Sequence, residues 1–81
     1  MKHAGADALG RLEPLLVRIR AVGALKEKGC GVFYLKGRAA LHFHEDPSGL
    51  YADLRLAGDD FERLKVDAPE EQDRLIQRLK A

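Results

Sequence analysis

Apolar residues recur along residues 12–22 at the spacing of an α-helix. Residues three and four positions apart share one face of a helix, so these residues form a single stripe. The stripe comprises Leu12, Leu15, Leu16, Ile19 and Val22. Pro14 is tolerated in a first helical turn, where its missing N–H costs nothing. We therefore predict a helix that begins near Glu13 and ends at Gly23, a residue suited to the left-handed conformation after a helix.

Residues 31–66 show short alternating segments separated by turn residues, a pattern typical of β-strands. Four strands are predicted, at Gly31–Leu35, Arg38–His44, Tyr51–Ala57 and Asp60–Val66. The connections are short and contain Gly, Asp, Pro or Ser, as tight turns do. Consecutive strands joined in this way are neighbours, which predicts an antiparallel meander. In the fourth strand, Phe61 competes with Leu64 and Val66 for the core.

A second helix is predicted after Asp67, which forms a capping-box pattern with Glu70. Its narrow stripe comprises Gln72, Leu75, Ile76 and Leu79. Residues 1–8 are small and polar and are expected to fray. The element order is then α-β-β-β-β-α in one domain, residues 1–81. Burial of both helical stripes predicts an α+β two-layer sandwich, in which a four-stranded antiparallel meander carries two helices on one face.

The register of the two middle strands decides which side chains share a sheet face. Placing Phe43 opposite Ala52 turns the apolar residues of both strands toward the helices. The same register places His42 opposite Asp53 on the other face. A shift by one residue would bury charged side chains, which is costly. The predicted open face comprises His42, His44, Tyr51, Asp53 and Arg55, with Phe33 and Leu35 joining from the first strand.

The composition is 46% hydrophobic and 33% charged, as in folded domains. Apolar runs are only a few residues long, whereas a bilayer span needs roughly 20. The N-terminal residues lack the apolar core of a signal peptide. Cys30 is the single cysteine, which excludes an internal disulfide. These features predict a cytoplasmic protein that does not contact membranes.

The net charge is +1, but it is unevenly distributed: residues 1–40 carry eight Lys/Arg and three Asp/Glu, whereas residues 41–81 carry six and ten. Such asymmetry is found on nucleic-acid-binding proteins. It also arises when opposite charges from the two halves meet on the folded surface. The nucleic-acid alternative depends on Arg18, Arg20, Lys26, Lys28, Lys36 and Arg38. The Lys36-Gly37 turn would then contact the phosphate backbone, although the acidic second half and the lack of a helix-turn-helix count against this.

Two imidazoles lie on the same side of a strand at His42 and His44, a spacing found in zinc and non-haem iron sites. Glu45, Asp46 or Asp53 could supply a carboxylate ligand, and a metal site of His42, His44 and Asp53 is one alternative. The other is that the histidines are strand residues hydrogen-bonded to Asp53 and Tyr51. No second spaced pair of ligands accompanies them, and no cofactor is predicted.

No catalytic motif is present, so the protein is predicted not to be an enzyme. Ser48 and Cys30 are the candidate nucleophiles, and neither lies in a recognised triad or elbow. The thiol of Cys30 is near Lys26 and Lys28 in sequence, where a lowered pKa would make it reactive. The alternative is a small, partly buried residue at the start of a strand.

Three motifs follow one another in the strand region: F-Y-L-K-G-R from Phe33, L-H-F-H-E-D from Leu41 and Y-A-D-L-R from Tyr51. In these motifs the chain resembles a group of short bacterial proteins of unknown function, over about Leu12 to Leu79. This resemblance implies no activity. More remotely, the order of strands and turns is similar to the MmcQ/YjbR-like group, whose longer members are compared with DNA-binding folds on shape alone. The chain lacks their extra elements, so no site residues are carried over.

The open face is the part of the chain that gathers chemically capable groups. Aromatic and arginine side chains are the usual anchors of protein interfaces, which favours Tyr51, Phe33 and Arg55. We therefore predict a small interaction module that binds a protein partner or a second copy of itself through this face.

Overall fold

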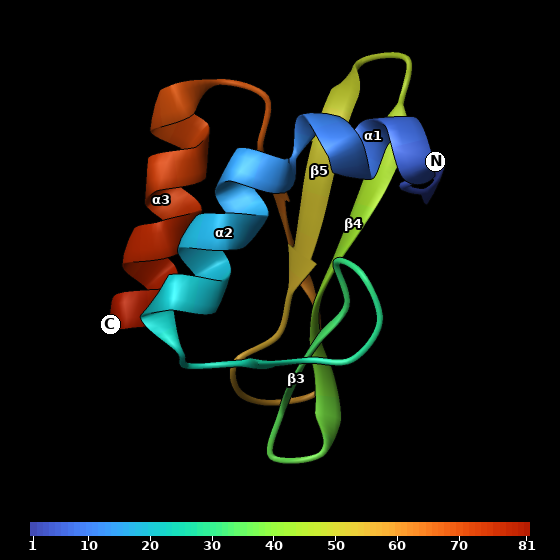
Figure 1. Ribbon diagram of the computed structural model, residues 1–81. Coiled ribbons are helices and arrows are strands. Elements are labelled where there is room, and N and C mark those ends of the chain that lie inside the picture. The colour runs from blue at the N-terminus through green and yellow to red at the C-terminus, as the bar shows by residue number, and fades with distance from the viewer.

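The computed structural model describes residues 1–81 and contains three helices and six strands (Figure 1). In chain order these are β1 (Lys2–His3), α1 (Ala6–Arg11), α2 (Glu13–Val22), β2 (Lys26–Glu27), β3 (Phe33–Leu35), β4 (Arg38–Asp46), β5 (Gly49–Leu54), β6 (Glu62–Lys65) and α3 (Pro69–Lys80). The antiparallel sheet has the order β2-β3-β4-β5-β6, and β1 pairs with β4. The predicted α+β meander is confirmed, with α1, β1 and β2 as additional elements.

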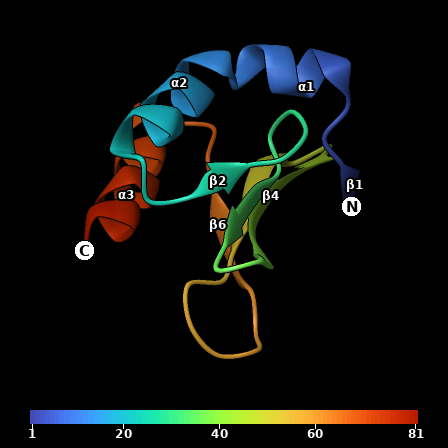
Figure 2. The same ribbon diagram turned by 60° about the horizontal axis from the view of Figure 1, so that its bottom comes forward.

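The helices lie over one face of the sheet (Figures 1 and 2). Leu16 of α2 and Leu75 of α3 belong to the same buried cluster as Leu41 and Leu54 of the two central strands. Full burial of such a side chain stabilises the fold by about 1.5–3 kcal/mol. The opposite face of β4 and β5 has no helix over it and is the open face. None of the three helices has the length and apolar character that a bilayer span requires.

The predicted register of β4 and β5 is confirmed. Phe43 pairs with Ala52, His42 with Asp53 and His44 with Tyr51. Phe43 and Ala52 are buried against the helices. Because neighbouring residues of a strand point to opposite faces, the histidines lie on the open face.

Phe33 does not join the open face, contrary to the expectation from sequence. It is fully buried in the core, because the register shifts between Phe33 and Tyr34. Tyr34 pairs with Ala39, but Phe33 pairs with Leu41, so β4 contains one extra residue, Ala40. A bulge of this kind reverses the face to which the following residues point.

The N-terminal residues are ordered rather than frayed. β1 pairs Lys2 with Glu45 and His3 with His44. The N–H of Ala4 donates to the carbonyl of Phe43 at 3.0 Å, and the N–H of Gly5 donates to the Glu45 carboxylate at 2.7 Å. These contacts hold the segment against β4, and α1 follows directly with Ala8 buried.

The fourth predicted strand corresponds to β6, which is shorter than expected. The core-facing residues of the predicted strand are Leu64 and Val66, not Phe61. Val66 is fully buried, and Leu64 packs against the core. Phe61 lies on the other face with 38% of its surface exposed. Arg63, two residues after Phe61, points to the same side of the sheet. It pairs with Asp53 and so also belongs to the open face.

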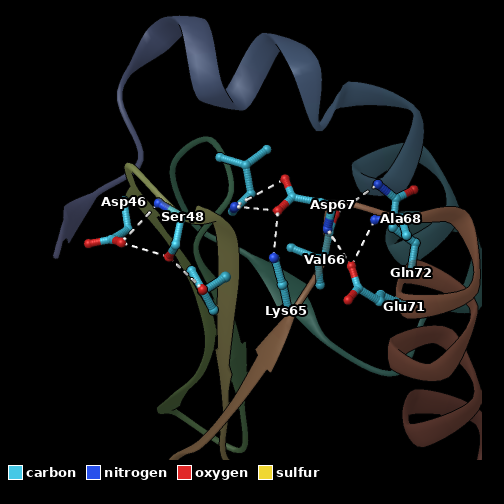
Figure 3. Close-up of polar contacts among 10 residues, drawn as sticks. Asp46, Ser48, Lys65, Val66, Asp67, Ala68, Glu71 and Gln72 are labelled. Carbon is cyan, nitrogen blue, oxygen red and sulfur yellow. Dashed lines mark hydrogen bonds and ion pairs between the residues drawn. The ribbon is translucent and has the colours of Figure 1, made fainter.

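Both helix boundaries near the predicted caps have a clear physical cause. α2 ends at Gly23 with a φ of 75°, as predicted. α3 begins one residue later than predicted, because the Asp67 carboxylate accepts from the N–H of Leu50 at 3.1 Å instead of capping the helix (Figure 3). Glu71, not Glu70, accepts from the N–H groups of Asp67 and Ala68.

Candidate functional site

Three imidazoles meet on the open face. His42 and His44 are alternate residues of β4, and His3 lies opposite His44 on β1. One ring nitrogen from each residue lies within 4.8 Å of the others. The chain has only three histidines, so all of them belong to this group, which we call the histidine cluster.

The polar atoms of the histidine cluster converge on His44. Its Nε2 lies 3.0 Å from Nδ1 of His42 and 3.1 Å from Oδ2 of Asp53. An ionised carboxylate only accepts hydrogen bonds, so Asp53 places the proton on Nε2 of His44. Nδ1 of His42 must then present its lone pair to the same proton. His44 Nδ1 is buried and has no hydrogen-bond partner.

Asp53 is fixed and charged. Arg63 donates to both of its oxygens, at 2.8 and 2.9 Å. These bonds hold the pKa of Asp53 below its ordinary value, against the opposing effect of burial. The Asp53 side chain is only 10% exposed, whereas that of Arg63 is 48% exposed. The carboxylate therefore remains an anion beside His44 at neutral pH.

His42 is kept neutral by its surroundings. Burial lowers its pKa, and the nearby His44 adds to this effect. The ring of Phe61 lies 5.0 Å from that of His42, and the guanidinium of Arg55 lies 4.4 Å from the Phe61 ring. A neutral imidazole offers a lone pair to a metal ion or a proton donor.

The structure brings together the three residues of the predicted metal alternative, His42, His44 and Asp53. Tyr51 shares their face, but its hydroxyl is hydrogen-bonded to Ser48 at 2.7 Å. Phe33 lies in the core, so the open face retains Arg55 and gains Phe61. Binding of a protein partner or self-association through this face stays a prediction.

No pattern in the sequence assigned His3, Phe61 or Arg63 to the open face. His3 lies in a two-residue strand, which is too short to show any alternation. Phe61 and Arg63 belong to the strand whose register the sequence left open. One clue was available for Arg63. A charged Asp53 on a sheet face favours a basic residue opposite it on the next strand.

The three arginines of the nucleic-acid alternative are paired with carboxylates, whereas its three lysines are not. Arg18 contacts Asp73 at 2.9 Å, and Arg38 contacts Asp59 at 3.1 Å. Arg20 binds both Glu13 and Glu27. Two of these ion pairs join the basic and acidic halves of the chain, as the alternative explanation of the charge asymmetry expects. The remaining lysines, Lys26, Lys28 and Lys36, are exposed, and Lys28 lies over the ring of Tyr34.

Cys30 is an exposed free cysteine in the segment between β2 and β3. The expectation of a buried or partly buried residue at a strand start is therefore wrong. Its thiol is remote from the histidine cluster in sequence and shares no element with it.

Comparisons with protein-family models, with curated proteins and with solved structures find no match to this chain. The resemblance to short bacterial proteins and to the MmcQ/YjbR-like group therefore stays a prediction.

Proposed function

We propose that this domain binds a divalent transition metal ion, with zinc as the reference ion, through His3, His42 and His44. The observation that carries the proposal is the convergence of every histidine in the chain on one point. Imidazole nitrogen is a preferred ligand of zinc, copper, nickel and iron. Three histidines with an open fourth position is a common ligand set for zinc.

The spacing of the donor atoms supports this assignment. In a tetrahedral site with Zn–N bonds of about 2.0–2.1 Å, adjacent donor atoms lie about 3.3 Å apart. The nitrogen pair of His42 and His44 at 3.0 Å is close to that value. The side chain of His3 is exposed, so its ring can close the remaining gap by a change of rotamer.

The electrostatics also favour a cation at this point. The proton on Nε2 of His44 lies between two acceptors, a nitrogen of His42 and an oxygen of Asp53. Metal binding would replace this proton, as it does at metal sites generally. Asp53 supplies a negative charge beside the ion, and Arg63 keeps the carboxylate in position.

Calorimetric titration of the metal-free protein with zinc sulfate tests the proposal. Cys30→Ser is the background for all variants, because an exposed thiol also binds zinc. We expect one ion per chain and at least a tenfold loss of affinity in His3→Ala and in His42→Ala. Lys2→Ala, which alters the exposed neighbour of His3, is the matched control and should bind zinc as the background does.

Cobalt(II) gives a second measurement, because its visible absorption reports the coordination geometry. We expect an intense tetrahedral spectrum that is lost in His42→Ala, with circular dichroism confirming that the variant is folded. Failure of the Cys30→Ser protein to bind zinc, or binding that survives in His42→Ala, would exclude the site.

A further inference from the structure

A second site lies at the end of the sheet where the β3–β4 turn meets the loop between β5 and β6 (Figures 1 and 2). A cavity of about 110 Å³ is present there. Three cationic side chains line it, those of Lys36, Arg38 and Arg55, together with apolar Leu35 and Leu56. We call it the cationic notch.

The charge of the cationic notch is only partly compensated. Lys36 forms no ion pair within 4.0 Å. The guanidinium of Arg55 donates to main-chain carbonyls, that of Ala39 at 2.7 Å and more distantly that of Asp59, and faces no carboxylate. Arg38 contacts the Asp59 carboxylate at 3.1 Å, so one of the three positive charges is offset. The notch therefore retains an excess of positive charge.

The backbone at Lys36 supports a role for its side chain. Lys36 has a φ of 53° and Gly37 a φ of 82°, so both central residues of this two-residue hairpin turn are left-handed. Such turns favour Asn and Gly, and a non-glycine residue at positive φ is uncommon. A lysine carries a conformational cost here that glycine would avoid, and outliers of this kind cluster at functional sites.

The volume limits what the notch can hold. It exceeds several times the roughly 10–15 Å³ that a cavity needs to hold one water molecule, but it is below the roughly 300 Å³ at which pockets for drug-sized ligands begin. A tetrahedral oxyanion fits within this volume. Guanidinium groups bind phosphate oxygens in a fork, and lysine adds a point charge.

We infer that the cationic notch binds a single phosphate group, as presented by a phosphomonoester. The inference does not depend on the metal site. The two sites are nevertheless neighbours, because Arg55 of the notch lies against Phe61, and Phe61 lies against His42.

The test is a titration of the full, metal-free chain with inorganic phosphate at constant ionic strength, followed by amide NMR. We expect saturable shifts confined to residues around Gly37 and Gly58. Lys36→Gly removes the charge and suits the left-handed backbone, so it should remain folded and bind phosphate roughly tenfold more weakly. Lys26→Ala, an exposed lysine on β2, is the matched control and should bind as the wild type does.

Two short single-stranded oligonucleotides distinguish the sources of the phosphate. One carries a 5′-phosphate and the other a 5′-hydroxyl, and we expect only the first to compete with inorganic phosphate. Equal competition by both would replace the inference with binding of a nucleic-acid backbone. Equal phosphate binding by Lys36→Gly and the wild type, or shifts spread over all basic residues, would overturn it.

Discussion

The two faces of strands β4 and β5 are built from alternate residues of the same segments, yet they are stabilised by different forces. On the helix-covered face, Leu41, Phe43 and Leu54 are buried among apolar side chains of the helices. On the open face, His44 and Asp53 are buried almost as deeply, at 8% and 7% exposure, without joining that cluster. Burial on one face is stabilised by removal of apolar area from water, and on the other by mutual hydrogen bonds.

This difference separates stability from chemistry. A buried polar group must be hydrogen-bonded or it destabilises the fold, and Arg63, Asp53, His44 and His42 form one such chain of contacts. These polar contacts leave the lone pair on Nδ1 of His44 without a partner. The apolar core lies on the helix-covered face only. Removing an apolar side chain there should therefore reduce the free energy of unfolding much more than removing one on the open face.

Two phenylalanines on opposite faces provide the largest expected contrast. Phe33 is fully buried in the core, whereas Phe61 is 38% exposed. We expect Phe33→Ala to reduce the free energy of unfolding by about 3–5 kcal/mol. Phe61→Ala loses only its contacts with His42 and Arg55 and should cost less than about 1 kcal/mol. Urea unfolding measures both values.

Equal m-values for the two variants and the wild type would show that the substitutions change stability without changing the surface exposed on unfolding. A small loss in Phe33→Ala would contradict the bulge that turns this residue inward and would restore it to the open face.

The alternation of apolar and polar residues alone predicted the pairing of the two central strands, β4 and β5, correctly. A shift of β4 against β5 by one residue cannot bury Leu41, Phe43 and Leu54 together, so alternation fixes which sheet face His42 and Asp53 occupy. Side chains that alternate over six residues contain this information, because a slip by one would exchange the two faces.

The features that the sequence did not reveal have no such periodic pattern. The face of Phe33 depends on one extra residue in β4, Ala40, and the alternation continues unchanged through it in the sequence. The position of His3 depends on pairing across about 40 residues by a strand of only two. Asp67 fits a helix cap equally well, but the N–H of Leu50 competes for its oxygens, and that competition exists only in the folded chain.

An intermediate effect is expected when the polar chain on the open face is broken. Asp53→Asn keeps the shape of the side chain but removes the charge that accepts from Arg63 and His44. We expect a loss of about 1–2 kcal/mol in the free energy of unfolding, since hydrogen bonds to a charged group contribute more than neutral ones. Tyr51→Phe, which loses only the contact with Ser48, is the control and should lie within about 0.5 kcal/mol of the wild type. A loss in Asp53→Asn as large as that in Phe33→Ala would mean that the two faces contribute equally.

The smallest expected effect concerns a polar contact on the helix side, between Glu27 of β2 and Arg20 of α2. The hydrogen bond from Arg20 lowers the pKa of Glu27 below its ordinary 4.5, and the N–H of Gly31 adds to this, while burial opposes it. The unfolded chain therefore binds the proton more readily than the folded one. The stabilisation is complete above pH 4.5 and is lost as the pH falls toward the lower, folded-state pKa.

Glu27→Gln should consequently lower the urea midpoint at pH 7 by less than Asp53→Asn does, because exposed ion pairs are screened by water. At pH 3 the gap between this variant and the wild type should narrow. An undiminished gap at pH 3 would show that the stabilisation from Glu27 does not follow the ionisation of its carboxyl group. Ordered polar contacts would then stabilise both sides of the sheet without depending on charge.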